Sequence, residues 1–271
     1  MGSSRETHAG LRARLDQRRD DPGLAGVPGE LFAVADLVDR DPPLRSALSD
    51  GGQPVQARSG LVDALFGARL SRLAVGVLRD LVSQRWSSPA ELVEALEGLA
   101  AQAAFLVAQK DGNLDQVQDH MFAFAQAVSG SAELQMALTN PAAGAQVKAS
   151  LVESLLQDRA GPVATEVLAY AMSHLRGRRA DSVVEGLLSL AAEQQGRSVA
   201  EVRVARPLDA DQERRLVAAL SKLQGRDVRL NVAVDPRVIG GISVRIAGEV
   251  MDATMATRIE QARRMLVGQP R

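Results

Sequence analysis

Residues 228–246 read Val-Arg-Leu-Asn-Val-Ala-Val-Asp-Pro-Arg-Val-Ile-Gly-Gly-Ile-Ser-Val-Arg-Ile, and this stretch decides how the rest of the chain is interpreted. Apolar residues occupy every second position in 228–234 and again in 242–246. Such period-two alternation is typical of strands that bury one face. Asp235-Pro236 and Gly240-Gly241 lie between the two runs and indicate a turn. The stretch therefore predicts two strands joined as a hairpin.

The residues around this hairpin complete a small α+β domain. Residues 199–206 predict a strand that Pro207 ends, and residues 209–223 predict a helix with a leucine stripe. Residues 249–252 predict a short further strand. The chain then ends in a predicted helix whose apolar face is formed by Met255, Ile259, Ala262 and Leu266. The expected order is strand, helix, strand, strand, short strand, helix.

From about residue 5 to residue 195 the sequence has helical periodicity and almost no strand signal. Ser88-Pro89-Ala90-Glu91 is typical of a helix start, with Ser as the N-cap, Pro at the first position and Glu three residues after the cap. That helix is expected to run to about Gln109, before Asp111-Gly112. Other helices are predicted near 30–40, 44–48, 55–66, 70–85, 162–176 and 182–195.

The helical part contains an internal repeat. Residues 30–86 align without a gap to residues 120–176, and the identities, such as Phe32 with Phe122, fall at helical spacing. The sequence thus predicts a mainly α chain of two tandem small helical bundles and a small α+β domain. The expected domains are 1–105, 106–196 and 197–271, with the helix 89–109 shared by the two bundles.

Composition argues against several classes of protein. The 32 basic and 33 acidic side chains nearly cancel, which gives no indication of a nucleic-acid or membrane-surface protein. No apolar run approaches the ~18 residues of a spanning helix, and the N-terminus lacks the apolar core of a secretory signal. The chain has no Cys, which excludes disulfides and thiolate chemistry. We expect a cytoplasmic protein, soluble or peripheral, without direct membrane insertion.

No motif predicts catalysis. The three histidines lie far apart without zinc-ligand spacing, and neither a phosphate-binding loop nor a nucleophile elbow is present. We therefore expect no catalytic, metal or cofactor site. Two basic clusters, Arg12 to Arg19 and Arg176 to Arg179, leave open an alternative function as a helical adaptor or nucleic-acid-associated protein. No aromatic residues interleave with them, so base stacking is not indicated.

The C-terminal domain resembles the delta subunit of bacterial F-type ATP synthases, whose mitochondrial counterpart is the oligomycin-sensitivity-conferring protein. The residues that carry the resemblance are Asp235, Pro236, Gly240, Gly241, Asp252 and Arg258. Residues 114–156, with Asn140-Pro141, resemble the helical domain of the same family. Members commonly carry Gly-Ser after the aspartate that corresponds to Asp252, where this chain has Ala253-Thr254. They also usually have one helical domain rather than two. The chain is thus similar to long forms with an extra N-terminal copy.

The resemblance implies a non-catalytic peripheral-stalk subunit on the cytoplasmic face of the membrane, which holds the catalytic head against the torque of the rotor. It also implies two partners, the N-terminus of an alpha subunit and the C-terminal helix of the b subunit. The alpha segment is expected between the first and fifth helices of the second bundle, at Ala103, Leu106, Gln109, Val163, Val167 and Tyr170. The b subunit is expected on the terminal helix, at Met255, Ile259, Ala262 and Leu266.

Overall fold

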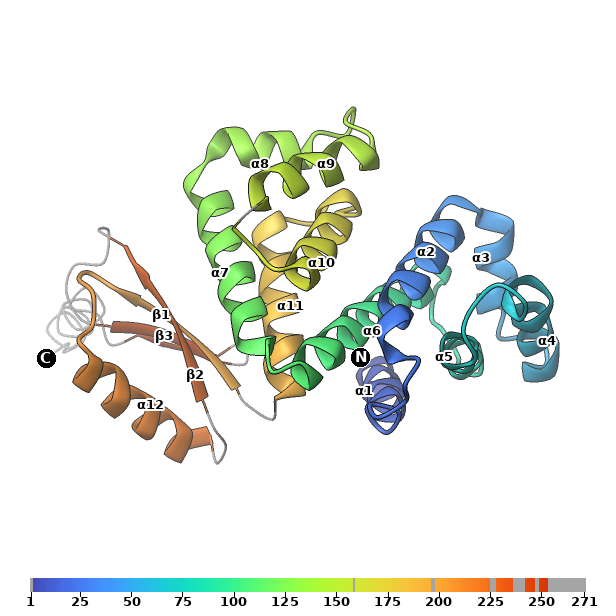
Figure 1. The fold of residues 1–271 in the computed structure, drawn as a ribbon, viewed down its shortest axis with the longest axis horizontal. Coiled ribbons are helices and arrows are strands. Elements are labelled where there is room, and N and C mark those ends of the chain that lie inside the picture. Colours follow the sequence, from blue (N-terminus) through green and yellow to red (C-terminus); the bar gives the residue numbers. More distant parts are fainter. Residues whose placement is uncertain are drawn as a thin grey trace, which may run out of the picture. The chain divides into compact units, whose positions relative to one another are not determined.

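The computed structural model describes residues 2–157, 159–195, 198–224, 228–235, 242–246 and 249–252 (Figure 1). Contacts divide the chain into a first unit, Met1–Val117 with Ala143–His174, and a second unit, Gln118–Ala142 with Leu175–Arg271. The limits of these contact units differ from the domain boundaries expected at 105 and 196, and those boundaries stay a prediction.

The first unit is helical. Its elements are α1 (Gly2–Asp16), a short 3-10 helix (Leu24–Gly26), α2 (Val27–Arg40), α3 (Pro42–Ser49), α4 (Val55–Phe66), α5 (Arg72–Val82), α6 (Pro89–Lys110), the start of α7 (Leu114–Gly130), α9 (Ala145–Leu156) and α10 (Pro162–Ser173). These bounds confirm the helices that the periodicity predicts, within a few residues at each end.

Helix α6 is the central element of the first unit, because α1, α2, α3, α5 and α10 all contact it. It starts as the sequence predicts, since the Ser88 side chain accepts a hydrogen bond from Glu91 N at 3.2 Å. Along its length, small buried side chains such as Ala103 and Ala104 let neighbouring helices approach closely. This helix therefore provides the surface on which the rest of the unit assembles.

The helix bounds follow the repeat seen in the sequence. Helix α3 and helix α8 (Ala132–Thr139) begin and end 90 residues apart, and so do α4 and α9. The same offset relates the start of α5, at Arg72, to the start of α10, at Pro162. This agreement supports the repeat, and the mainly α fold with a small α+β domain is confirmed.

The second unit combines helices with a sheet. It contains most of α7, α8, α11 (Ala180–Gln194), β1 (Ser198–Val204), α12 (Ala210–Gln224), β2 (Val228–Val234), β3 (Ile242–Ile246) and β4 (Glu249–Asp252). All four expected strands are present. The terminal helix predicted over residues 255–266 lies outside the described residues.

The predicted hairpin between β2 and β3 is wrong. The strand order is β2-β1-β3-β4, so β1 lies between these two strands, parallel to β2 and antiparallel to β3. Helix α12 joins β1 to β2, and a helical crossover of this kind places consecutive strands side by side in parallel. The connection 235–241 is also longer than the two to five residues usual in hairpin loops. Alternation shows that a strand has a buried face but does not show which strand it pairs with.

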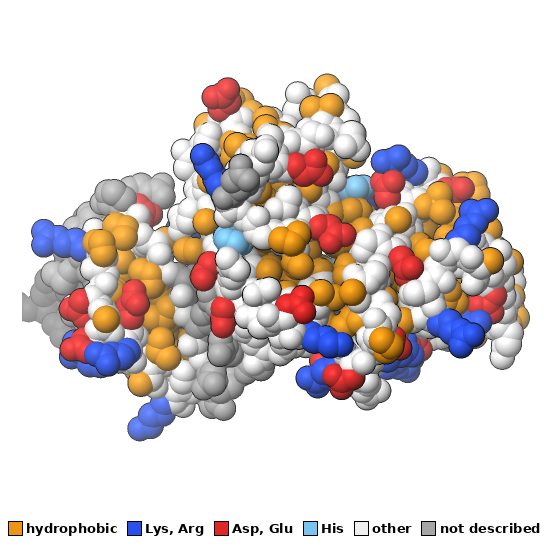
Figure 2. Space-filling view, viewed as in Figure 1, with side chains coloured by type: hydrophobic (Ala, Val, Ile, Leu, Met, Phe, Trp, Pro, Cys, Tyr) orange, Lys and Arg blue, Asp and Glu red, His pale blue; other side chains and the backbone are white. Residues whose placement is uncertain are grey.

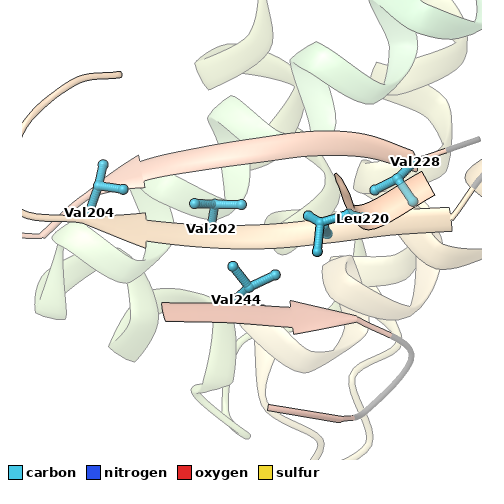
Figure 3. Packing of buried hydrophobic residues seen from close by; sticks show 6 residues of the cluster. Val202, Val204, Leu220, Val228 and Val244 are labelled. Atoms are coloured by element: carbon cyan, nitrogen blue, oxygen red, sulfur yellow. The ribbon is translucent and has the colours of Figure 1, made fainter. Parts of the chain in front are cut away.

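The core of the sheet combines side chains of β1, β2 and β3 with Leu220 of α12 (Figure 3). Its buried side chains are Ala200, Val202, Val204, Leu220, Val228 and Val244. At the start of α12, the Asp209 carboxylate accepts from Gln212 N at 2.8 Å, and Asp209 N donates to the Gln212 side chain at 3.0 Å. This reciprocal capping box fixes where α12 begins.

Candidate functional site

Within the first unit, α10 contacts α2 and α6 through aromatic and charged side chains. Tyr170 lies at the centre of this contact. Its ring centroid is 4.3 Å from that of Phe32 on α2, at an interplanar angle of 31°. Its hydroxyl donates to the Glu97 carboxylate on α6 at 3.3 Å. One side chain therefore connects three helices.

His174 continues this cluster at the end of α10. Its ring stacks on Tyr170 with centroids 4.2 Å apart and planes 15° from parallel. Nε2 lies 3.1 Å from the Asp36 carboxylate of α2, and the His174 side chain is only 11% exposed. Arg40, one turn further along α2, also pairs with Asp36, at 2.9 Å. We call Phe32, Asp36, Tyr170 and His174 the α2–α10 contact.

Glu166 marks the other end of the same contact. A Cβ placed on Gly29, in the first turn of α2, would lie 3.5 Å from its Oε1, so the carboxylate lies close over the backbone of α2. Although Glu166 keeps much of its surface exposed, this partial loss of solvent raises the pKa of its carboxyl group. The contact thus extends along α10 from Glu166 to His174.

The residues predicted to bind an alpha subunit fall into two groups in the structure. Ala103, Leu106 and Val167 are 0–2% exposed and pack inside the first unit. Gln109, Val163 and Tyr170 are half-buried. Only these last three keep part of their surface exposed. Their role in binding stays a prediction.

The residues that carry the family resemblance are only partly described. Asp235 follows β2 and its N–H donates to Val204 O at 2.9 Å, which extends the pairing of β1 with β2. Asp252 ends β4, where its backbone lies opposite Ser243. The other signature positions and the residues predicted to bind the b subunit lie outside the described residues: Pro236, Gly240, Gly241, Arg258, Met255, Ile259, Ala262 and Leu266.

A hollow of about 270 Å³ lies in the second unit, lined by residues of α7, α11, β1 and β2. Phe122 is one of its lining residues, and Asp181 and Glu185 contribute carboxylates. Arg179 donates to Asp181 at 2.6 Å and holds the pKa of that carboxyl group below its ordinary value. In the part of the chain that the structure describes, no group of three or more His, Cys, Asp or Glu could hold a metal ion.

Several arginines of the basic clusters pair with neighbouring acids. Arg14 and Arg18 both pair with Asp80, at 3.3 and 2.7 Å, and Arg179 pairs with Asp181. On the face shown in Figure 2, basic and acidic side chains are interspersed. This arrangement favours surface ion pairs over a polyanion-binding patch. Among the described helices, none is long and apolar enough to cross a membrane.

Sequence reasoning found Tyr170 but missed the rest of the α2–α10 contact. Phe32 stood out only as a repeated core position, and His174 only as an isolated histidine. The signal that could have found the contact is that Tyr170 is the only tyrosine of the chain and has Asp80 as its counterpart in the first copy. A bulky ring at one copy alone indicates a contact that the other copy does not make.

Comparisons with known proteins agree with the C-terminal signature. A model of the family described as ATP synthase delta (OSCP) subunit matches residues 97–266. The ATP synthase subunit delta of Streptomyces griseus is 40% identical over 268 residues, which cover 98% of this chain and 99% of that relative. The chain belongs to the ATP synthase delta (OSCP) family.

Other members of the delta (OSCP) family match over a similar length. The ATP synthase subunit delta of a Parafrankia species is 40% identical over 275 residues, covering 98% of this chain and 99% of the relative. That of Salinispora tropica is 38% identical over 267 residues, covering 97% of each. The family match begins within α6, whereas these relatives also align to the helices before it. The extra N-terminal copy is therefore shared with these delta subunits.

Proposed function

We propose that this chain is a non-catalytic peripheral-stalk subunit of a proton-translocating F-type ATP synthase. In this role it links the N-terminal segment of an alpha subunit to the C-terminal helix of the b subunit, at the cytoplasmic face of the membrane, and resists the torque of the rotor. The observation that carries the proposal is the 40% identity to a delta subunit over nearly the full length of both chains.

The fold suits such a link. A chain that transmits torque needs helices that are tied to one another rather than joined by loops alone. In the first unit, α6 contacts α1, α2, α3, α5 and α10, and the α2–α10 contact joins segments that are far apart in sequence. Partner helices commonly bind such proteins through apolar anchors spaced at i, i+3, i+4 and i+7. The half-buried Gln109, Val163 and Tyr170 are the alpha-binding residues we propose, and Met255, Ile259, Ala262 and Leu266 those for the b subunit.

Titration calorimetry with two synthetic peptides tests this function. The alpha peptide has the sequence of the N-terminus of the alpha subunit, and the b peptide has the sequence of the C-terminal helix of the b subunit, both from the same organism as the chain. We expect each to bind the full chain at micromolar concentration or below, with both bound together in a ternary mixture. If neither binds at that concentration, the stalk function is wrong.

The same preparation discriminates the alternative function as a nucleic-acid-associated adaptor. Binding to duplex DNA or single-stranded RNA that weakens steeply with added salt would favour that alternative. Because Arg14, Arg18 and Arg179 are already paired with carboxylates, we expect no such binding at physiological salt.

A further inference from the structure

The surface of α10 that carries Tyr170 is already covered in this chain. Phe32 lies on the Tyr170 ring, Asp36 binds His174, and Gly29 lies beside Glu166. These three α2 residues, Gly29, Phe32 and Asp36, are spaced 3 and 4 apart, so they form one stripe along the helix. A helix that binds in a groove contacts it through a stripe of this kind. Helix α2 thus contacts α10 at three successive places along one stripe.

This stripe is separate from the face that holds α2 in its own bundle. Leu31, Val34, Ala35 and Val38 are 0–3% exposed and form the core face of α2. The α10-facing stripe consists instead of a glycine, one aromatic ring and one charged side chain. Separating α10 from α2 would therefore break the ring contact and the His174–Asp36 pair while leaving the core face of α2 intact. The contact with α10 therefore uses a different face of α2 from the face that packs in the first bundle.

The contact also has no counterpart within the first copy. At the repeat offset of 90, Tyr170 corresponds to Asp80 and Glu166 to Gly76. Asp80 is bound by Arg14 and Arg18 of α1, and it offers no ring for a partner helix to stack on. Of the two copies, only the second therefore carries the aromatic docking surface, and α2 covers it.

We infer that α2 is a built-in competitor for the partner-helix site on α10. A helix from the alpha subunit reaches Tyr170 only when α2 has moved away from it, so the extra N-terminal copy regulates when the second copy can bind. This inference rests on the proposed function, because it concerns the alpha-binding surface proposed above. In this way the extra N-terminal copy occupies the alpha-binding surface until the complex assembles.

The test uses the full chain with one acid removed from α2. Asp36→Ala breaks the pair with His174, whereas Asp39→Ala removes the same charge from the same helix at a residue bonded to Arg45 of α3. We expect Asp36→Ala to bind the alpha peptide about threefold to tenfold more tightly than the wild type. Asp39→Ala should bind as the wild type does. Binding of the b peptide should be unchanged in both variants, which shows that the C-terminal domain is folded, and an unchanged Trp86 fluorescence shows that the first unit is folded.

A second readout follows the surface directly. Because Tyr170 is the only tyrosine, a chain grown with 3-fluorotyrosine gives a single site for fluorine NMR. We expect the alpha peptide and the Asp36→Ala substitution to shift this signal in the same direction, since both separate Phe32 of α2 from the ring. Asp39→Ala should leave the signal in place.

The outcomes separate the two proposals. If the alpha peptide binds the wild type and both variants equally and the fluorine signal does not move, the competition is wrong and the stalk function stands. If the alpha peptide binds none of the three chains while the b peptide binds all of them, the alpha link of the proposed function is wrong, and the competition with it.

Discussion

The ring of Phe32 lies 4.3 Å from the ring of Tyr170, centroid to centroid, although one belongs to α2 and the other to α10. Phe32 is 7% exposed, whereas its counterpart in the repeat, Phe122, is half-buried and lines the hollow of the second unit. The same residue type at the same place in the repeat thus has two different surroundings. The duplication explains why both copies have a phenylalanine here. In the first copy the ring also contacts Tyr170 of α10.

Alanine substitutions at Phe32 and Phe122 should affect stability to different extents. Phe32→Ala should lower the free energy of unfolding by about 3 kcal/mol, because it empties a buried site and removes the Tyr170 contact. Phe122→Ala should cost about 1 kcal/mol, because that ring is partly solvated in the folded state. Urea denaturation followed by circular dichroism measures both, and Trp86 fluorescence follows the first unit alone. Equal losses for the two variants would contradict the assignment of the contact to Phe32.

The Glu30 carboxylate should contribute about as much to the free energy of unfolding as a small buried apolar side chain does. Glu30 of α2 accepts hydrogen bonds from Ser71 N at 3.0 Å and from Ser71 Oγ at 2.6 Å, which fixes the start of α5. Glu30→Ala should cost about 2 kcal/mol, since both bonds go to a partly buried charge. Glu94→Ala, on an exposed position of α6, should change stability by less than about 0.5 kcal/mol. If the two substitutions have the same effect in urea denaturation, the α2–α5 bond contributes nothing.

Two glycines, one inside α6 and one just after it, should respond to alanine with opposite signs. Gly112 has φ of 72°, and the pair of bonds from Gly112 N to Gln109 O and from Asn113 N to Ala108 O ends the helix as a Schellman motif. Gly112→Ala should therefore cost about 1 kcal/mol. Gly98 lies inside the helix with open space around it, so Gly98→Ala should stabilise by about 0.5 to 1 kcal/mol. Thermal denaturation that moves both midpoints in the same direction would contradict this backbone argument.

The sequence was sufficient for the elements of this fold because their signals are local. Periodicity and capping residues predicted α4 over 55–66 and the Ser88 cap of α6, and alternation predicted β2 and β3. Strand pairing is not local. The position of β1 between β2 and β3 depends on where α12 packs, and the alternating pattern of β3 is the same whichever strand lies beside it.

The candidate site was harder to predict for the same reason. Tyr170 could be singled out because it is the only tyrosine, but Asp36 and His174 are ordinary polar residues until the fold places them 3.1 Å apart. Two predicted partner residues, Ala103 and Leu106, are buried because they lie on α6, which five other helices of the first unit contact. Val167 is buried on α10, which is one of those helices. Sharing one helix between two bundles removes surface that the helical pattern alone would assign to a partner.

Because Arg179 and Asp181 form an ion pair at the start of α11, we expect the protein to lose stability in acid. Arg179 lowers the pKa of the Asp181 carboxyl group, so its contribution is present above the ordinary value of about 4 and is lost as the pH falls through the lowered value. Asp181→Asn should therefore lower the melting temperature at pH 7 and have little effect at pH 2. The neighbouring Ser182→Ala keeps the carboxylate and serves as the control. A deficit that is the same at both pH values would show that the pair does not act through ionisation.

For Glu166 we expect the opposite dependence of stability on pH. Because partial burial beside Gly29 raises its pKa, its contribution to stability is present below the ordinary value of about 4 and is lost as the pH rises through the raised value. Glu166→Gln removes the charge that α2 desolvates, so the variant should melt at a higher temperature than the wild type at pH 7 and at the same temperature near pH 3.5. Glu153→Gln, on an exposed position of α9, is the charge-matched control. If Glu166→Gln has no advantage at pH 7, the carboxylate is not held against α2, and α10 lies further from the first bundle than the α2–α10 contact requires.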